Sequence, residues 1–192
     1  MKQEVLAALA DAATIVLADG PDGADLVPTS LADSGPIERA VAGWMPGERA
    51  WVAKLAGARA LMGGYALRGA IREGRAEDVP IRLSAIPSYL GTLPRPIVTV
   101  VRGQPDGDGY RLGASVGWAP AACSLADAVV VEIDPDGPLL PAPRVGTPSC
   151  VATTTPGTRG EGSGGASGSI STTTASASEH AAGAQPTLAP RR

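Results

Sequence analysis

The sequence predicts an α/β fold, an open and mostly parallel sheet with flanking helices, followed by a disordered tail. Through residues 1–144, short apolar runs alternate with charged stretches of helical periodicity. This order implies parallel strands joined by right-handed crossovers. The runs IVTVV at 97–101 and AVVVEI at 128–133 are apolar on both faces, as expected when helices cover both sides of a sheet.

Each element is expected from a local pattern. Val5, Leu6 and Leu9 share one face of the first helix, Gly74 suits a helix C-terminus, and Ser84 suits a helix N-cap. The expected strands, about six, are β-branched or apolar runs bounded by turn residues and lie near 14–17, 40–44, 58–62, 79–83, 97–101 and 128–133. The expected helices lie near 3–12, 24–34, 46–55, 65–73, 85–90 and 119–126.

The composition changes at about residue 145, which divides the chain into a domain at 1–144 and a low-complexity tail at 145–192. Val151, Ile170 and Leu188 are nearly the only large apolar residues of the tail. Such a segment cannot bury enough surface to offset its ordering entropy, so disorder is expected. A flexible linker, a phosphorylated tail, and a truncation or reading-frame change in the gene are the alternative origins.

Composition excludes several classes of protein. The formal net charge of -3 argues against a nucleic-acid partner or an anionic membrane surface. No stretch approaches the roughly 18 apolar residues of a membrane span, and the first residues do not resemble a signal peptide. Two cysteines, Cys123 and Cys150, form neither a disulfide framework nor a zinc spacing. A reduced, cytoplasmic protein without a metal site is expected.

Two glycine-containing loops follow expected strands. Gly20 closes the first, Leu17–Gly20, where a glycine lets a ligand approach the backbone; the alternative is a plain turn. Gly64 lies in the second, and Arg68 and Arg72 on the following helix add the positive charge that a carboxylate or phosphate needs. The alternative is a strand-to-helix turn with solvated arginines.

A third loop, residues 102–115, directly follows the clearest strand and is rich in glycine and polar residues. A loop of this composition at a strand end is a candidate ligand site, and a wide surface hairpin without a ligand is the alternative. Its candidate binding residues are Gly103, Asp106, Gly107, Gly109, Tyr110 and Ser115.

The residues of common catalytic arrangements are missing from the predicted domain. His180, the only histidine, lies in the tail, so a Ser–His or Cys–His mechanism has no base. Asp19, Asp106, Asp108 and Glu132 are separate carboxylates and do not form an evident acid/base pair. Glu132 could line a site, but a structural, hydrogen-bonded carboxylate is favoured. No catalytic residue is therefore assigned.

Three segments resemble a known family when read together. Residues 74–87, GRAEDVPIRLSAIP, resemble the GRADYVPVHLSEIP region of acetyl-CoA hydrolases and CoA-transferases, including 4-hydroxybutyrate CoA-transferases. Residues 98–117 and 126–135 resemble the two regions that follow in that family, with the same order and spacing. Arg102, Arg111 and Trp118 depart from the family pattern. The resemblance covers residues 12–144 more loosely.

The resemblance implies a fold of two similar α/β halves, of which this chain carries the N-terminal one. In such enzymes a glutamate of the second half attacks an acyl-CoA thioester, and CoA then passes to an acid or, in hydrolases, to water. A backbone oxyanion hole also lies in the second half, while the first half supplies part of the carboxylate site. Coenzyme A would be a co-substrate, with no other cofactor, and the partners would be acyl-CoA, a small carboxylate and a separate chain carrying the second half.

Three hypotheses follow for this chain. It is one half of a CoA-transferase or acetyl-CoA hydrolase, probed by mixing it with the other half. It is a non-catalytic truncated relic, against which a monodisperse and cooperatively melting monomer would count. It is a ligand-binding module that keeps a weak carboxylate or CoA site, which calorimetry would detect.

Overall fold

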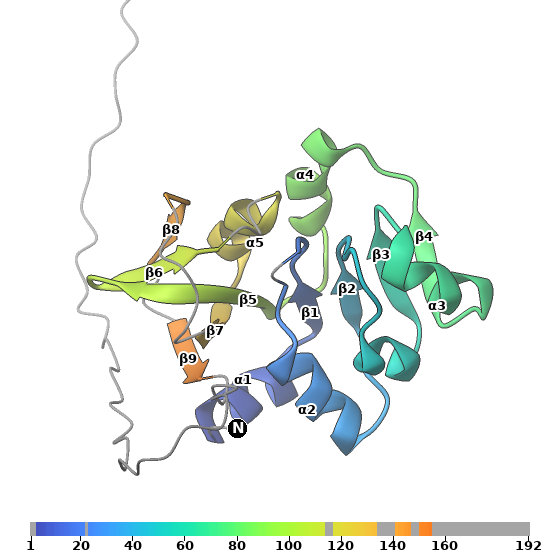
Figure 1. The fold of residues 1–192 in the computed structure, drawn as a ribbon, viewed down its shortest axis with the longest axis horizontal. Helices are drawn as coiled ribbons and strands as arrows, with labels where there is room; N and C mark the ends of the chain where they lie inside the picture. The colour runs from blue at the N-terminus through green and yellow to red at the C-terminus, as the bar shows by residue number, and fades with distance from the viewer. Residues whose placement is uncertain (1–2, 22, 114–116, 134–140, 147–149, 155–192) are drawn as a thin grey trace, which may run out of the picture.

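The computed structural model describes residues 3–21, 23–113, 117–133, 141–146 and 150–154, and within these ranges nine strands form a single mixed sheet (Figure 1). The strands are β1 Thr14–Leu17, β2 Ala40–Ala42, β3 Ala58–Leu61, β4 Ala76–Val79, β5 Ile97–Asp106, β6 Gly109–Leu112, β7 Ala128–Ile133, β8 Arg144–Val145 and β9 Cys150–Thr154. The helices are α1 Gln3–Asp11, α2 Leu26–Ser34, α3 Arg68–Arg72, α4 Ile86–Leu90 and α5 Ala119–Leu125, with the short 3-10 turns η1 Ala50–Lys54, η2 Tyr65–Leu67 and η3 Leu83–Ala85.

The sheet is mostly parallel, which confirms the predicted fold class. Its order is β4-β3-β2-β1-β5-β6-β8, and β7 pairs with β5 and with β9. Six of the strand pairings are parallel: β1 with β2, β1 with β5, β2 with β3, β3 with β4, β7 with β5 and β7 with β9. Only the pairings of β6, with β5 and with β8, are antiparallel.

Two hydrophobic cores lie on the two faces of the sheet because side chains alternate along each buried strand. On β1, Ile15 and Leu17 belong to one core while Val16 belongs to the other. The first core also contains side chains of α1, α2, η1 and α3, such as Trp51. The second contains side chains of α4 and α5, such as Ile86 and Ala122. Helices therefore cover both faces, as the apolar strands predicted.

Two expected elements differ from the structure. The expected helix at 46–55 is only the 3-10 turn η1, because Leu55 leaves it to form a parallel bridge with Ile37. The expected strand at 79–83 is instead β4 at Ala76–Val79, and it ends just before Pro80, which has no N–H for sheet pairing. β4 is a mostly exposed edge strand, so it carries no apolar run that would mark it in the sequence.

Of the two interpretations of residues 102–115, an irregular ligand loop and a surface hairpin, the structure shows the hairpin over the described residues 102–113. β5 continues to Asp106, turns at Gly107-Asp108 and returns as β6 in an antiparallel hairpin. Gly107 has a φ of 61°, which favours glycine at the first central position of such a two-residue turn. In Figure 1 this hairpin extends to the left, away from the carboxyl ends of β1, β2 and β3 at the top.

Structure also continues into the segment predicted to be disordered. β9, Cys150–Thr154, pairs in parallel with the outer edge of β7, and Val145 of β8 is buried. The prediction of disorder from residue 145 is therefore corrected for these residues. The rest of the predicted tail, residues 155–192, lies outside the described residues.

Candidate functional site

The candidate site is the edge of the sheet where β1, β2 and β3 end, since ligands of open α/β sheets bind at the carboxyl ends of the strands. These three strands are neighbours, so the loops that follow them lie along one edge. Gly20 follows β1 and Gly64 follows β3, so the fold brings both predicted binding residues to this edge. Their role in ligand binding stays a prediction.

Gly20 joins the loops after β1 and β2. Its N–H donates to the carbonyl of Trp44 at 2.9 Å, and its carbonyl accepts from the N–H of Gly23 at 3.3 Å. Its φ of 121° is a conformation that side-chain-bearing residues rarely adopt. The glycine is therefore needed for the shape of this loop, whether or not a ligand approaches it.

The loop after β3 displays two large side chains on a strained backbone. Met62 and Tyr65 have φ values of 59° and 49°, in the left-handed region that costs energy for residues other than glycine. Both are exposed, at 44% and 64%. The ring of Tyr65 meets that of Trp44 edge-on at a centroid distance of 5.7 Å, which connects this loop to the one after β2. Strain of this kind is often found at functional sites.

The two glycines of this loop are not equivalent, and alanine substitutions should separate them. A Cβ at Gly63 would lie 2.4 Å from Cδ1 of Ile71 and 2.5 Å from Oδ1 of Asp78, whereas a Cβ at Gly64 would meet nothing within 4 Å. We expect Gly63→Ala to lower the free energy of unfolding by about 1–2 kcal/mol and Gly64→Ala to leave it within about 0.5 kcal/mol. Urea unfolding of both variants measures this, and equal losses would contradict it.

The β5–β6 hairpin separates most of the other predicted binding residues from this edge. Gly103 pairs with Leu112 of β6 and with Ile133 of β7, so it lies between two strands. A Cβ there would lie 2.9 Å from the carbonyl oxygen of Arg111, so strand packing explains the glycine. Tyr110 and Gly109 belong to β6, and Gly107 forms the turn.

Asp106 has partners within the hairpin region. Its carboxylate lies 2.6 Å from the guanidinium of Arg111 and 2.9 Å from that of Arg144 on β8. These ion pairs give Asp106 a structural role in joining β5, β6 and β8. Ser115, the last predicted binding residue, lies outside the described residues.

The carboxyl end of β1 also carries a buried carboxyl group that the predicted site did not include. Asp19 is 7% exposed and accepts a hydrogen bond from the backbone N–H of Trp118, just before α5. Within the described ranges, Asp19 Oδ1 and the indole N–H of Trp118 have no hydrogen-bond partner. Burial raises the pKa of Asp19 above its ordinary value. Sequence reasoning missed this contact because the two residues are far apart in the chain.

Glu132, at the end of β7, stabilises the start of α2. Its two carboxylate oxygens accept the backbone N–H groups of Asp25 at 2.8 Å and Val27 at 2.6 Å. Asp25 in turn accepts the indole N–H of Trp51 at 3.0 Å. Burial raises the pKa of Glu132, and the backbone donors act in the opposite direction. The favoured interpretation of Glu132 as a structural carboxylate is confirmed.

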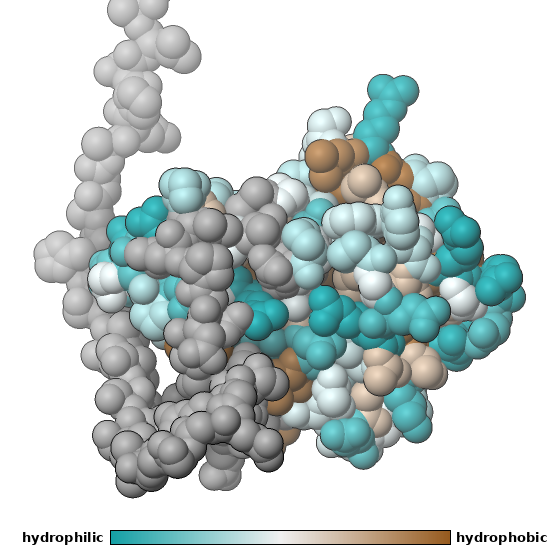
Figure 2. Space-filling model, in the orientation of Figure 1, coloured by the Kyte–Doolittle hydropathy of each residue, from teal (hydrophilic) through white to brown (hydrophobic). Residues whose placement is uncertain are grey.

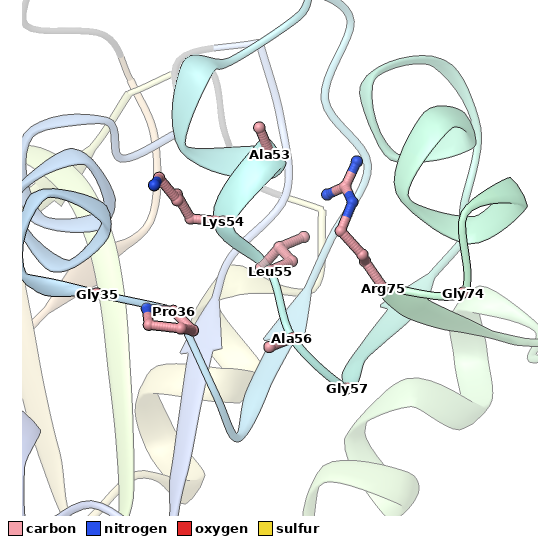
Figure 3. A pocket seen from close by; sticks show the side chains of 9 residues that line it. All are labelled: Gly35, Pro36, Ala53, Lys54, Leu55, Ala56, Gly57, Gly74 and Arg75. Atoms are coloured by element: carbon pink, nitrogen blue, oxygen red, sulfur yellow. The ribbon is translucent and has the colours of Figure 1, made fainter.

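A shallow pocket of about 370 Å³ lies at the opposite edge of the sheet, beside the amino ends of β2, β3 and β4. Figure 3 shows Lys54 and Arg75 on either side of Leu55 there. The guanidinium of Arg75 already binds the carboxylate of Glu73 at 2.7 Å and the carbonyl of Val52. The guanidinium of Arg75 therefore has partners within the protein. The residues that line the pocket do not include any of the predicted binding residues.

Comparison with solved structures identifies the architecture. A 4-hydroxybutyrate CoA-transferase from Porphyromonas gingivalis matches 79% of this chain with a TM-score of 0.50 and 13% sequence identity. The fold is CoA-transferase-like. The match covers 38% of the transferase chain, so this chain spans well under half of that protein. No protein-family model matches the chain, and no curated protein matches it in sequence.

Two further findings concern the part of the chain that the structure describes. No group of three or more His, Cys, Asp or Glu side chains there could hold a metal ion. None of its helices is long and apolar enough to cross a bilayer. At the carboxyl ends of β1, β2 and β3, the CoA-transferase-like fold carries three loops, the aromatic pair of Trp44 and Tyr65, and the buried carboxyl group of Asp19.

Proposed function

We propose that this chain is the N-terminal half of a CoA-transferase or acetyl-CoA hydrolase, which binds acyl-CoA and a small carboxylate together with a second half. The observation that carries the proposal is the CoA-transferase-like fold, which agrees with the family that residues 74–87, 98–117 and 126–135 resemble. Where the structure describes them, these segments form β4 to the start of α4, the β5–β6 hairpin and β7. Fold and sequence order thus support the same ancestry.

The chemistry of the described residues supports a binding role more than a catalytic one. Glu132 is engaged by backbone donors, Asp106 by two arginines, and Asp19 by the backbone of Trp118. None of these carboxylates is open to attack a thioester, the step that covalent CoA transfer requires. We therefore infer that these carboxylates do not supply the nucleophile and that it belongs to the second half.

Exposed apolar side chains indicate where a second half would dock. Among the described residues, the exposed large hydrophobic side chains are Leu6, Met62, Tyr65 and Leu83. Three of these, Met62, Tyr65 and Leu83, follow the carboxyl ends of β3 and β4. Figure 2 shows apolar side chains gathered at the top of the molecule, around α4 and next to these strand ends. Apolar surface beside a ligand edge is typical of an interface.

The test is a CoA-transfer assay with acetyl-CoA and propionate, followed by detection of propionyl-CoA. We expect no transfer by the chain alone and transfer when it is mixed with a separate chain carrying the second half of a CoA-transferase. Turnover of the thioester by the isolated chain, with covalent labelling of one of its own residues, would contradict the proposal. So would failure of every mixture to transfer CoA.

A matched pair of variants tests the docking surface. Met62→Ala with Tyr65→Ala should weaken association with the second half by about tenfold, since each removes a large exposed side chain at the carboxyl edge. Leu6→Ala is the control and should leave association unchanged, because Leu6 is 45% exposed but lies on α1. Equal effects of the two changes, measured by titration calorimetry, would exclude this surface.

A further inference from the structure

The strongest unexplained feature of the candidate site is the way in which the turn before α5 covers Asp19. A Cβ at Gly117 would lie 2.3 Å from Oδ2 and 2.9 Å from Oδ1 of Asp19, so the glycine backbone lies directly on the carboxyl group. The next residue, Trp118, donates its backbone N–H to the same group. On another side, a Cβ at Gly43 would lie 2.6 Å from Cβ of Asp19 and from Cζ2 of Trp118. Two segments, one with Gly43 and one with Gly117 and Trp118, thus enclose this carboxyl group.

This enclosure suits a neutral carboxyl and not an ionised one. An ionised, buried carboxylate needs several hydrogen bonds or a cation to replace its lost water. Both oxygens of Glu132 accept backbone N–H groups, at 2.6 and 2.8 Å. The Asp19 carboxyl accepts the backbone N–H groups of Trp118 and of Asp19 itself, but its Oδ1 has no partner among the described residues. The Gly117 backbone lies against the carboxyl group and Asp19 is 7% exposed, so water has little access to it.

Among the described residues, no charged side chain contributes to the pKa shift of Asp19. Gly43, Gly117 and Trp118, which contact it, carry no charge. On the neighbouring strand β5 the charged residue near this level is Arg102, whose Cα lies opposite that of Glu132 in the register of β5 and β7. The causes that shift the pKa of Asp19 are burial, which raises it, and backbone hydrogen bonds, which lower it; Arg102 is not among them.

We propose that the contact between Asp19 and the Gly117–Trp118 turn is a proton-dependent latch at the carboxyl edge of the sheet. A neutral Asp19 allows the turn to close over the carboxyl group. When Asp19 releases its proton to solvent, the carboxylate must reach water, and the turn moves away. Opening uncovers an acidic group and the indole N–H of Trp118 beside Gly20, so pH controls access to this part of the candidate site.

The direction of the pH dependence follows from linkage. Asp19 has a higher pKa in the closed form than in an open, solvated form, for which the ordinary value of 3.8 applies. The closed form is therefore fully stable below the ordinary pKa and becomes less stable as the pH rises toward the raised pKa. Within that window the opening equilibrium increases about tenfold for each pH unit. Above the raised pKa both forms are ionised and the equilibrium stays constant.

Hydrogen exchange of the Trp118 backbone amide measures the latch directly, because this N–H is bonded to Asp19 only in the closed form. Intrinsic amide exchange rises tenfold per pH unit, so a protected amide with a constant opening equilibrium gives a logarithmic slope of about one. The latch adds one further unit to this slope, because the opening equilibrium itself increases tenfold per pH unit. The logarithm of the exchange rate should therefore rise with pH with a slope of about two between the ordinary and the raised pKa of Asp19. Asp19→Asn, which cannot ionise, should give a slope of about one throughout.

Asp33→Asn is the matched control, since Asp33 is an exposed carboxylate on α2, and it should keep the slope of about two. Gly117→Ala is the second variant, because its Cβ cannot fit over Asp19, and it should leave the Trp118 amide unprotected at every pH. A wild-type slope of about one, or the same steep slope in Asp19→Asn, would overturn the proposal. Because none of these measurements uses CoA, the outcome is independent of the proposed function.

Discussion

Replacing Glu132 with alanine should lower the free energy of unfolding by about 3 kcal/mol. The carboxylate is 2% exposed and accepts the N–H groups of Asp25 and Val27, at the first turn of α2. Without it, these buried donors lose their partners and a cavity is left at the end of β7. Both effects destabilise the native state, and the first is larger because charge-assisted hydrogen bonds are lost.

Urea unfolding followed by circular dichroism measures this loss. Glu48→Ala is the control, because Glu48 is an exposed carboxylate in the loop before η1, and it should change stability by less than about 0.5 kcal/mol. Glu132→Gln keeps the shape and one acceptor oxygen, so it should fall between the two. If Glu132→Ala proves as mild as Glu48→Ala, Glu132 does not stabilise the start of α2.

The parts of the fold that the sequence predicts correctly are those with strong apolar patterns. The first half of β5, IVTVV, and most of β7, AVVVEI, consist mainly of valine and isoleucine, as expected for strands that are covered on both faces. The positions of Gly20 and Gly64 at one edge follow from the same reasoning, because carboxyl ends of parallel strands share an edge. Local pattern and topology together are sufficient for these features.

Other parts depend on neighbours that the sequence does not reveal. β4 is polar because it is an exposed edge strand, and the glycine-rich composition of 102–115 conceals a hairpin in which Gly103 packs between two strands. β9 lies in a segment of low apolar content, and it forms a strand by pairing with the edge of β7 that faces away from β5. In each case the partner strand, and not the segment itself, determines the structure.

Of the candidate site, the sequence predicted the glycine loops of Gly20 and Gly64 but not the buried side chain of Asp19. Glycines that follow strands can be recognised locally, but the burial of Asp19 depends on Gly43 and on the Gly117–Trp118 turn, two segments that are far from Asp19 in the chain. An aspartate after a strand is ordinarily solvated, so nothing in the sequence marks Asp19 as buried. The feature that most distinguishes this edge therefore arises from tertiary packing.

Gly43→Ala should lower the free energy of unfolding by about 3 kcal/mol, since it adds a methyl group at the point where these segments meet. The new Cβ would lie 2.6 Å from Cβ of Asp19, 2.6 Å from Cζ2 of Trp118 and 2.8 Å from the backbone nitrogen of Asp19. The backbone atom cannot yield without moving β1, to which the N–H of Gly43 is bonded through the carbonyl of Leu17 at 3.0 Å. Thermal and urea unfolding measure the loss.

Gly47→Ala is the matched control, because it adds the same methyl group in the same loop and meets nothing within 4 Å. It should change stability by no more than about 0.5 kcal/mol. A second comparison isolates the contact with Asp19: in the Gly43→Ala background, Asp19→Gly removes the opposing Cβ and should recover part of the loss, giving a coupling energy of about 1 kcal/mol in a double-mutant cycle. Additive effects in that cycle would show that Gly43 and Asp19 do not press against each other, and the close packing on which the latch depends would then be absent.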